Sequence, residues 1–410
     1  MIKEITKKDL LILFGNVIDH FDTSLYVFMA PILAPLFFPN EDALVGLIMA
    51  YSILATNIIT RPIGIYIFSV IAKHKGPNQS LSLSLIGVGF TTLFISFIPY
   101  YSDIGIISPI IFILCRSIRE LFASGEIAIA SIYILEKKTE KMSFKSSYLF
   151  QCSTMIGIIL ASISATILYH YEIKDLWRVF YFIGGSAAIV GYVFRKKYFS
   201  PIYYTVPVEN SVILSLKVLW SNKFNLLKIA VISGCSYITY LLPFVIMNRL
   251  MPFITNIDIQ KLAINNNYML FIDLILILFF GKMLTNFHYN NVMKYASLTL
   301  TIAIIPLFYF LPNSNENYIL FVKFVIIVLG IIYMCPLNIW TKNIINNQNN
   351  YLIVGIGSAL GNSIIGKLSP SIALFIFHYT NNINYVSVFF MSLFFTAYLI
   401  ISLCLYKKED

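Results

Sequence analysis

Long apolar runs follow one another along almost the whole chain, and this pattern limits the fold more than any other feature. A membrane-spanning helix needs about 20 apolar residues. Runs of this length lie near residues 10–38, 43–72, 80–100, 106–135, 146–170, 178–195, 224–248, 263–287, 292–312, 318–342, 352–378 and 383–406. Strands of a membrane barrel would alternate in polarity over about ten residues, and these runs do not. The sequence therefore predicts an all-α integral membrane protein with twelve transmembrane helices.

Composition argues against a water-facing globular protein. Hydrophobic residues make up 58% of the 410 positions and charged residues only 12%, whereas soluble domains carry roughly 25% charged residues. Twelve spans of about 25 residues use about 300 positions, which leaves no room for a separate soluble domain. The chain has no phosphate-binding glycine loop, and its H-x-x-x-x-D pattern at 170–175 lies in a short loop. We therefore expect no enzymatic activity.

The net charge and the cysteines point to no further partner. The formal charge is +10, but the basic residues are spread among short loops, so we expect no nucleic-acid partner. The five cysteines lie in apolar runs without a CxxC pair, and we interpret them as packing residues. Neither a metal site nor another cofactor is expected.

Basic residues gather in alternate connections, which sets the expected orientation. They lie in both tails and in the second, fourth and sixth loops, at Lys3, Lys7, Lys8, Lys73, Lys75, Lys137, Lys138, Lys141, Lys145, Arg195, Lys196, Lys197, Lys217, Lys223, Lys407 and Lys408. The other connections hold mostly acids, such as Asp103. We therefore predict that the N- and C-termini are cytoplasmic and that the polar N-terminal segment is a retained tail.

A long polar interval divides the predicted spans into two groups of six. We predict an N-terminal half at 1–195, a cytoplasmic linker at 196–223 and a C-terminal half at 224–410. Paired halves are typical of transporters in which a site near the membrane midplane opens alternately to either side. The alternative is an inert bundle of two packed halves.

The first predicted span carries acids within its apolar sequence. A charge in the hydrocarbon core costs several kcal/mol, so it needs a partner or a watery cavity. At 100° per residue, Asn16, Asp19, Asp22 and Tyr26 fall within about 120° of one another on one helix face. This pattern predicts a binding site. The alternative is that the two acids only pair with basic residues of neighbouring helices.

The fourth predicted span presents a ladder of alternating charges. Arg116, Arg119, Glu120 and Glu126 also lie within about 120° of arc. In a functional interpretation, Arg116 binds an anion or couples to protons, and Glu126 exchanges a proton. In the structural alternative these charged side chains only pair with one another and stabilise their own helix. Arg61 in the second span either balances an acid of the first span or contributes to function.

The motifs of these three spans are similar to those of the metabolite:proton symporters. This branch of the major facilitator superfamily includes proline/betaine, 2-oxoglutarate, citrate and shikimate transporters. Its pattern is G-N-x-x-E-W-x-D-x-x-x-Y in the first helix, R-P-x-G in the second, and I-G-x-x-x-P, R-x-x-Q-G and G-E in the fourth. The matching positions here are Gly15, Asn16, Asp19 in place of Glu, Asp22, Tyr26, Arg61, Pro62, Gly64, Ile104, Gly105, Pro109, Arg116, Gly125 and Glu126. The likeness is strong in the first half and thin in the second. It implies the major facilitator fold and a bacterial inner (plasma) membrane as the location.

The sequence departs from this family in the loops that carry its gating charges. The family motif G-x-L-x-D-x-x-G-R-K reads here from Ser69 to Asn78, with Lys73 in place of the aspartate, Gly76 retained and neither basic residue present. The equivalent segment at 281–290 has also lost its acid and its arginines. In the family these charges latch the cytoplasmic side, so we expect a weakened latch.

We interpret the chain as a secondary active transporter of a small organic solute, with alternating access and proton symport, acting as a monomer in the lipid bilayer. The solute is a proline- or betaine-like zwitterion or a small carboxylate. The fork of Arg116 suits a carboxylate and the nearby acids suit a cation, which favours a zwitterion over a dicarboxylate. The alternatives are an uncoupled facilitator or exchanger and a non-transporting sensor derived from a transporter.

Each candidate residue receives a predicted role. Asp273 and Lys367 are isolated charges in the second half that either line the cavity or pair with each other. We assign substrate binding to Asn16, Asp19, Tyr26, Arg116 and Lys367, proton coupling to Asp22 and Glu126, and structural or gating roles to Arg61, Arg119, Glu120, Gly76 and Asp273.

Overall fold

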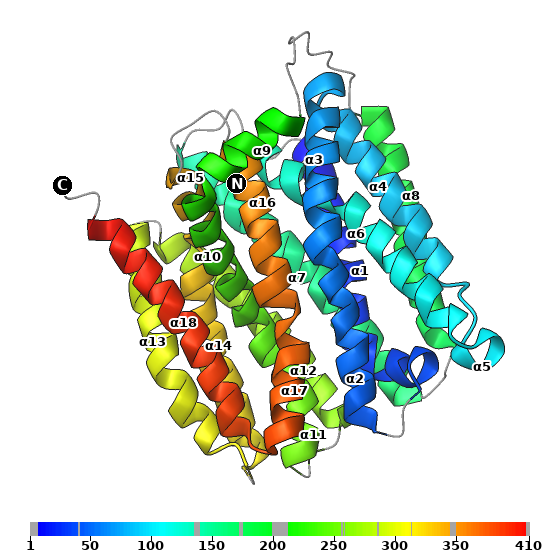
Figure 1. The fold of residues 1–410 in the computed structure, drawn as a ribbon, viewed down its shortest axis with the longest axis vertical. Coiled ribbons are helices and arrows are strands. Elements are labelled where there is room, and N and C mark those ends of the chain that lie inside the picture. Colours follow the sequence, from blue (N-terminus) through cyan, green and yellow to red (C-terminus); the bar gives the residue numbers. More distant parts are fainter. Residues whose placement is uncertain are drawn as a thin grey trace. The chain divides into compact units, whose positions relative to one another are not determined.

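The computed structural model describes residues 7–39, 42–134, 140–171, 175–198, 212–255, 257, 259–284, 287–312, 314–344 and 350–406. Regular structure in these ranges is helical, without a strand (Figure 1). Several predictions fall outside the described residues. They concern the tails at 1–6 and 407–410, the linker residues 199–211, and the loop residues Lys137 and Lys138.

Long helices cover the predicted spans in the first half of the sequence. They are α1 (Lys7–Phe37), α2 (Ala43–Ser52), which continues through the 3₁₀ turn η1 (Ile53–Thr56) into α3 (Asn57–Lys75), α4 (Pro77–Ile95), α6 (Ile107–Tyr133), α7 (Glu140–Tyr171) and α8 (Leu176–Tyr198). The short helix α5 (Tyr101–Ile104) lies between α4 and α6, and α9 (Val212–Ser221) precedes the second half.

Two spans in the second half of the sequence contain a π-helical segment, a feature frequent at functional sites. The helices are α10 (Lys223–Leu241), the π-helical η2 (Leu242–Ile246), α11 (Met247–Ile254), α12 (Ile259–Met283), α13 (Tyr289–Tyr309), α14 (Glu316–Met334), α15 (Leu337–Asn343), α16 (Asn350–Gly361), the π-helical η4 (Asn362–Lys367), α17 (Ser369–Thr380) and α18 (Ile383–Tyr406).

Ten helices in the described part of the chain are long and apolar enough to cross a membrane. The two further predicted spans correspond to α1 and α6, which carry the acids and arginines singled out from the sequence. These helices have 31 and 27 residues, which at 1.5 Å per residue is sufficient for a hydrocarbon core of about 30 Å. Their charges, and not their length, set them apart from the other ten.

The chain divides into two compact units. The first comprises Met1–Pro39, Thr56–Lys223 and Gln348–Ile356, and the second comprises Asn40–Ala55, Phe224–Asn347 and Gly357–Asp410. Helix α2 is therefore part of the second unit, where it packs on α17, and α18 packs along α13 in the same unit (Figure 1). The predicted division into two halves and a linker, with boundaries at 195 and 224, stays a prediction.

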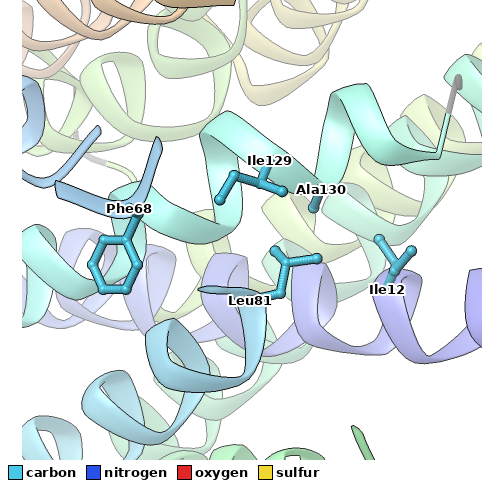
Figure 2. Packing of buried hydrophobic residues seen from close by; sticks show 5 residues of the cluster. All are labelled: Ile12, Phe68, Leu81, Ile129 and Ala130. Carbon is cyan, nitrogen blue, oxygen red and sulfur yellow. The ribbon is translucent and has the colours of Figure 1, made fainter. Parts of the chain in front are cut away.

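A buried apolar cluster joins four helices of the first unit. It consists of Ile12 from α1, Phe68 from α3, Leu81 from α4, and Ile129 and Ala130 from α6 (Figure 2). Each of these side chains is at most 9% exposed. Because lipid tails are as apolar as these side chains, close packing holds such a cluster together in a membrane. The cluster fixes the helices that carry the buried charges relative to one another.

Gly76 forms the turn between α3 and α4. Its φ of 86° lies in the left-handed region that glycine adopts without strain. Pro77 then begins α4 at a position where a missing N–H costs nothing. The retained glycine of the loop motif is thus a turn residue, and its gating role stays a prediction.

Candidate functional site

Arg119 lies at the centre of a buried charge network in the first unit. It is 0% exposed. Its Nη2 is 2.7 Å from Asp19 Oδ1 and donates to the Asp19 backbone oxygen at 2.9 Å. Its Nη1 donates to Glu120 Oε1 at 2.9 Å and to Thr23 Oγ1 at 2.7 Å. Nε lies 2.5 Å from Asp22 Oδ2, as an ion pair without hydrogen-bond geometry. Every guanidinium nitrogen thus faces an oxygen, and the side chain binds α1 to α6.

Arg116, one turn earlier on α6, contacts one of the same acids. Its Nη1 is 3.3 Å from Asp22 Oδ2, and Thr92 of α4 donates to the other oxygen of this carboxylate at 3.1 Å. The guanidinium stacks on Tyr26, with Cζ 4.6 Å from the ring centroid. Arg116 is 1% exposed, and its Nη2 has no hydrogen-bond partner among the described residues. One arm of its fork is therefore left for another acceptor.

Arg61 of α3 completes the network. Its Nε is 2.9 Å from Glu120 Oε2, while the other oxygen of this carboxylate accepts from Arg119. Three negative and three positive side chains thus meet, so the formal charges sum to zero, and each member is at most 5% exposed: Asp19, Asp22, Glu120, Arg61, Arg116 and Arg119. Mutual pairing offsets the cost of burying these charges, and removal of one partner from such a pair costs roughly 3–5 kcal/mol.

Among the described residues, Glu126 pairs with Arg195 of α8 and not with the arginines of this network. The contact is bidentate, with Nη2–Oε1 at 2.5 Å and Nη1–Oε2 at 2.7 Å. Arg195 also donates to the backbone oxygens of Leu81 and Leu11 at 3.0 and 3.2 Å, and it is 0% exposed. Gly15 leaves the necessary space, since a Cβ there would lie 1.9 Å from Nη2. The sequence interpretation counted Arg195 as a loop residue; the structure places it inside a helix with its side chain buried.

Asn16 contacts a different helix from the acids of its predicted face. Its Nδ2 donates to Ser153 Oγ and Thr154 Oγ1 of α7, each at 2.8 Å, and to the Phe150 backbone oxygen at 3.2 Å. The amide thereby fastens α1 to α7. Its predicted role in substrate binding stays a prediction.

The second unit holds two of the predicted residues and two that sequence reasoning missed. Lys367 ends η4 and is 1% exposed, and Asp273 of α12 is 6% exposed. In the described part of the chain no ion pair joins these two residues. The missed residues are Lys323 of α14, 0% exposed, and Arg249 of α11, 8% exposed. A charge inside an apolar run is the signal that would have found them.

The structure therefore gathers most of the predicted first-half residues in one place. The two arginines and Glu120 of α6 meet the two acids and Tyr26 of α1, together with Arg61 of α3. Glu126, Asn16 and Gly76 take part in separate contacts within the same unit. Arg116 pairs with α1 and not with Glu120 on its own helix, so the ladder of α6 is not self-contained.

Comparison with curated proteins gives partial matches. No protein-family model matches the chain. The chain is 29% identical over 187 residues to the proline/betaine transporter of Salmonella typhimurium, which covers 44% of this chain and 37% of that protein. It is 28% identical over 190 residues to the alpha-ketoglutarate permease of Escherichia coli, covering 45% and 44%. The matches thus span less than half of each relative. These names agree with the resemblance to metabolite:proton symporters.

Solved structures match over almost the entire chain. The partially occluded, inward-open xylose transporter XylE of E. coli aligns with a TM-score of 0.70 and 12% identity, covering 96% of this chain and 97% of that one. The major facilitator superfamily transporter FucP in its outward conformation aligns with a TM-score of 0.67 and 13% identity, covering 97% and 98%. The chain therefore has the major facilitator fold, and the predicted all-α, multi-pass membrane fold class is confirmed. The proteins it resembles are transporters, not enzymes.

Proposed function

We propose that this chain is a secondary active transporter that moves a small solute bearing a carboxylate across a bacterial inner membrane, by alternating access and with proton symport. The solute is a proline- or betaine-like zwitterion or a small carboxylate. The major facilitator fold and the names of the relatives support transport. The observation that carries the solute class is the unpartnered Nη2 of Arg116 beside Asp22.

Arg116 supplies the group that would recognise the solute. Its planar fork matches a carboxylate, and an N–H buried without a partner costs about 1–3 kcal/mol. A carboxylate oxygen at Nη2 would remove this cost. The Tyr26 ring already stacks on this guanidinium. The same ring face is therefore less suited to a second contact, with the cationic group of a zwitterion, and the contact of Arg116 with the carboxylate is better supported.

Asp22 is the acid best suited to couple proton and solute. It faces two arginines, and one of these is Arg116. A bound carboxylate adds one negative charge to a network whose charges sum to zero, and a proton on Asp22 restores the sum. That proton would also release Nη1 of Arg116, so proton binding raises solute affinity and solute binding raises proton affinity to the same extent. Glu126, which is paired with Arg195, stays a second candidate for coupling.

Uptake into proteoliposomes tests this proposal. Proline, betaine and small carboxylates would be offered with and without an imposed pH gradient. In the Arg116→Lys variant the charge remains but the fork is lost, so we expect the affinity for the transported solute to fall about tenfold or more, or about 1.4 kcal/mol. Arg178→Lys is the matched control, since Arg178 pairs with the exposed Asp175 outside the network. Normal transport of every solute by Arg116→Lys would rule out the carboxylate role.

The same experiment separates the alternatives. An uncoupled facilitator or exchanger would take up solute equally well in the presence of a protonophore. A sensor would bind solute and transport none. We also infer cytoplasmic N- and C-termini from the distribution of basic residues along the sequence, and we propose that the protein acts as a monomer.

A further inference from the structure

Asp273 is an acid near the middle of a membrane span. It belongs to α12, where it lies 14 positions after Ile259 and 10 before Met283, or about 21 and 15 Å at 1.5 Å per residue. The segment Gln260–Met283 is one of the helices that are long and apolar enough to cross a membrane. A charged carboxylate at this depth is costly unless a partner or water compensates it. The state of the carboxyl group therefore depends on what surrounds it.

The side of α12 that carries Asp273 faces the interior of the second unit. Asp273 is 6% exposed, and Leu270 and Ile277, about one turn before and after it, are 0% exposed. Phe271 and Ile275 lie two positions away in either direction, about 200° around the helix. These two residues are 48% and 65% exposed. The acid thus lies among buried apolar residues, and the opposite side of the helix points outward.

No side chain compensates Asp273 in the part of the chain that the structure describes. The residue has neither a hydrogen bond nor an ion pair there. Helix α12 packs against α11 and α14. The charged and titratable side chains of these two helices contact other groups, namely Tyr51 for Arg249, Asn248 for Lys323, Lys261 for Glu316, and backbone oxygens for Tyr318 and Tyr333. The other charges of α12, on Lys261 and Lys282, lie near its two ends.

A proton would neutralise Asp273 without disturbing any contact. A buried carboxylate that lacks a partner is costly, and a proton removes its charge. Asp22 and Glu126 differ in this respect, since each pairs with an arginine that a proton would leave uncompensated. A metal cation needs several oxygen ligands, and the described residues contain no group of three or more His, Cys, Asp and Glu that could hold one. The proton is thus the cation that this acid suits.

We propose that Asp273 is a proton-binding site of the second unit, in addition to Asp22. In the state described here the carboxyl group is protonated and neutral. It gives its proton to water when transport opens this side of α12 to water, and it takes up a proton again when the side closes. This inference rests on the proposed transport function and names a second group through which a proton gradient drives it.

Infrared difference spectra of the purified full chain in detergent test the protonation state without requiring transport. The spectrum of Asp273→Asn is subtracted from that of the wild type at neutral pH. We expect the C=O band of a protonated carboxyl group, and carboxylate bands in its place would overturn the proposal. Glu126→Gln is the matched comparison. Because Glu126 pairs with Arg195, its difference spectrum should show carboxylate bands.

The same two variants should differ in stability. Asparagine has nearly the size of the neutral acid and carries no charge, so Asp273→Asn should change the Tm by no more than about 4 °C. Glu126→Gln leaves the buried Arg195 without its carboxylate and should lower the Tm by more. A decrease in the Tm of Asp273→Asn as large as that of Glu126→Gln would mean that Asp273 is charged and paired in the folded protein, which contradicts the proposal.

Uptake of proline, betaine and small carboxylates into proteoliposomes tests the coupling. Without a membrane potential, each coupled proton raises solute accumulation about tenfold per pH unit of gradient. Asp273→Asn should therefore accumulate about tenfold less solute per pH unit than the wild type. It should still exchange labelled for unlabelled solute at equal pH. Asp273→Glu keeps a titratable group and should restore accumulation.

The outcomes separate this proposal from the transport function on which it rests. Accumulation by Asp273→Asn equal to that of the wild type would overturn the role of Asp273 in coupling. A protonated Asp273 in a wild type that takes up none of these solutes would refute the transport function and leave the proton site standing. Uptake driven by a pH gradient in a wild type with an ionised Asp273 would refute the proton site and leave the transport function standing.

Discussion

Replacing Glu126 with glutamine would leave the buried guanidinium of Arg195 with a neutral partner. The native pair has two charge-assisted bonds of 2.5 and 2.7 Å, and Arg195 is 0% exposed. Glutamine keeps one accepting oxygen, but its amino group would face a guanidinium N–H where a second oxygen stood. Breaking a buried pair on one side costs roughly 3–5 kcal/mol, because the other charge stays buried. We expect the free energy of unfolding of the first unit to fall by about this amount.

Thermal unfolding in detergent measures the loss. A thiol-reactive fluorophore would report unfolding, since Cys152 and Cys235 are buried. At about 2–4 °C per kcal/mol, the expected decrease in Tm is roughly 6–20 °C. The double variant Glu126→Leu with Arg195→Met removes both charges and should recover most of the loss. Glu316→Gln, which breaks an exposed pair, is the matched control and should change Tm by no more than about 4 °C.

Two results would refute this reasoning. In the first, the Tm of Glu126→Gln is close to that of the wild type. In the second, the Tm of the double variant is as low as that of Glu126→Gln. A further outcome concerns coupling. If Glu126→Gln is stable but its uptake no longer responds to a pH gradient, Glu126 exchanges a proton, as the sequence predicts.

Two further predictions concern residues outside the spans. The hydrogen bond from Tyr100 lowers the pKa of Asp175, with a further contribution from Arg178. A lowered pKa stabilises the fold above the unfolded value of about 3.9, and this stabilisation is lost as the pH falls. Asp175→Asn should therefore lower Tm at neutral pH, and its difference from the wild type should shrink as the pH falls below about 4 and vanish only below the lowered pKa of Asp175; a constant difference would contradict this. A Lys141→Cys variant lacking the five native cysteines should react with an impermeant thiol reagent only in opened cells, so labelling of intact cells would overturn the predicted orientation.

Hydropathy located the spans well because the bilayer requires each helix to be apolar over about 20 residues. The run at 292–312 corresponds to α13 (Tyr289–Tyr309), and the run at 383–406 is α18 (Ile383–Tyr406). The 3₁₀ turn at Ile53–Thr56 and the two π-helical segments were not predicted. Such local changes of winding depend on packing with other helices, and the residues in them, Leu242–Ile246 and Asn362–Lys367, share no sequence pattern that marks the change.

Helix periodicity predicted part of the candidate site. Asp19 and Asp22 do face a neighbouring helix together, as their spacing indicates, and they meet Arg119 there. Asn16 lies on the same predicted face but contacts α7. A face of about 120° on a helix surrounded by others touches more than one neighbour, and the sequence does not say where one contact ends and the next begins.

Arg195 shows what sequence patterns leave undecided. A basic residue at the end of an apolar run fits a cytoplasmic loop under the positive-inside rule. Its side chain instead turns inward to Glu126, which lies 69 positions away. Lys323 and Arg249 carried the usual signal of a charge in an apolar run, but the contact of Lys323 with Asn248 depends on how α11 and α14 pack.

During synthesis, α1 leaves the ribosome well before the helix that neutralises it. Each aspartate near the centre of an isolated helix costs about 2.5–3.5 kcal/mol on insertion. Asp19 and Asp22 together therefore raise the insertion free energy of α1 alone by roughly 5–7 kcal/mol. Arg119, which pairs with both, is 100 positions from Asp19, a delay of about 5–20 s at usual translation rates. We therefore expect α1 to be retained at the translocon until α6 arrives, so that the two helices enter the lipid together.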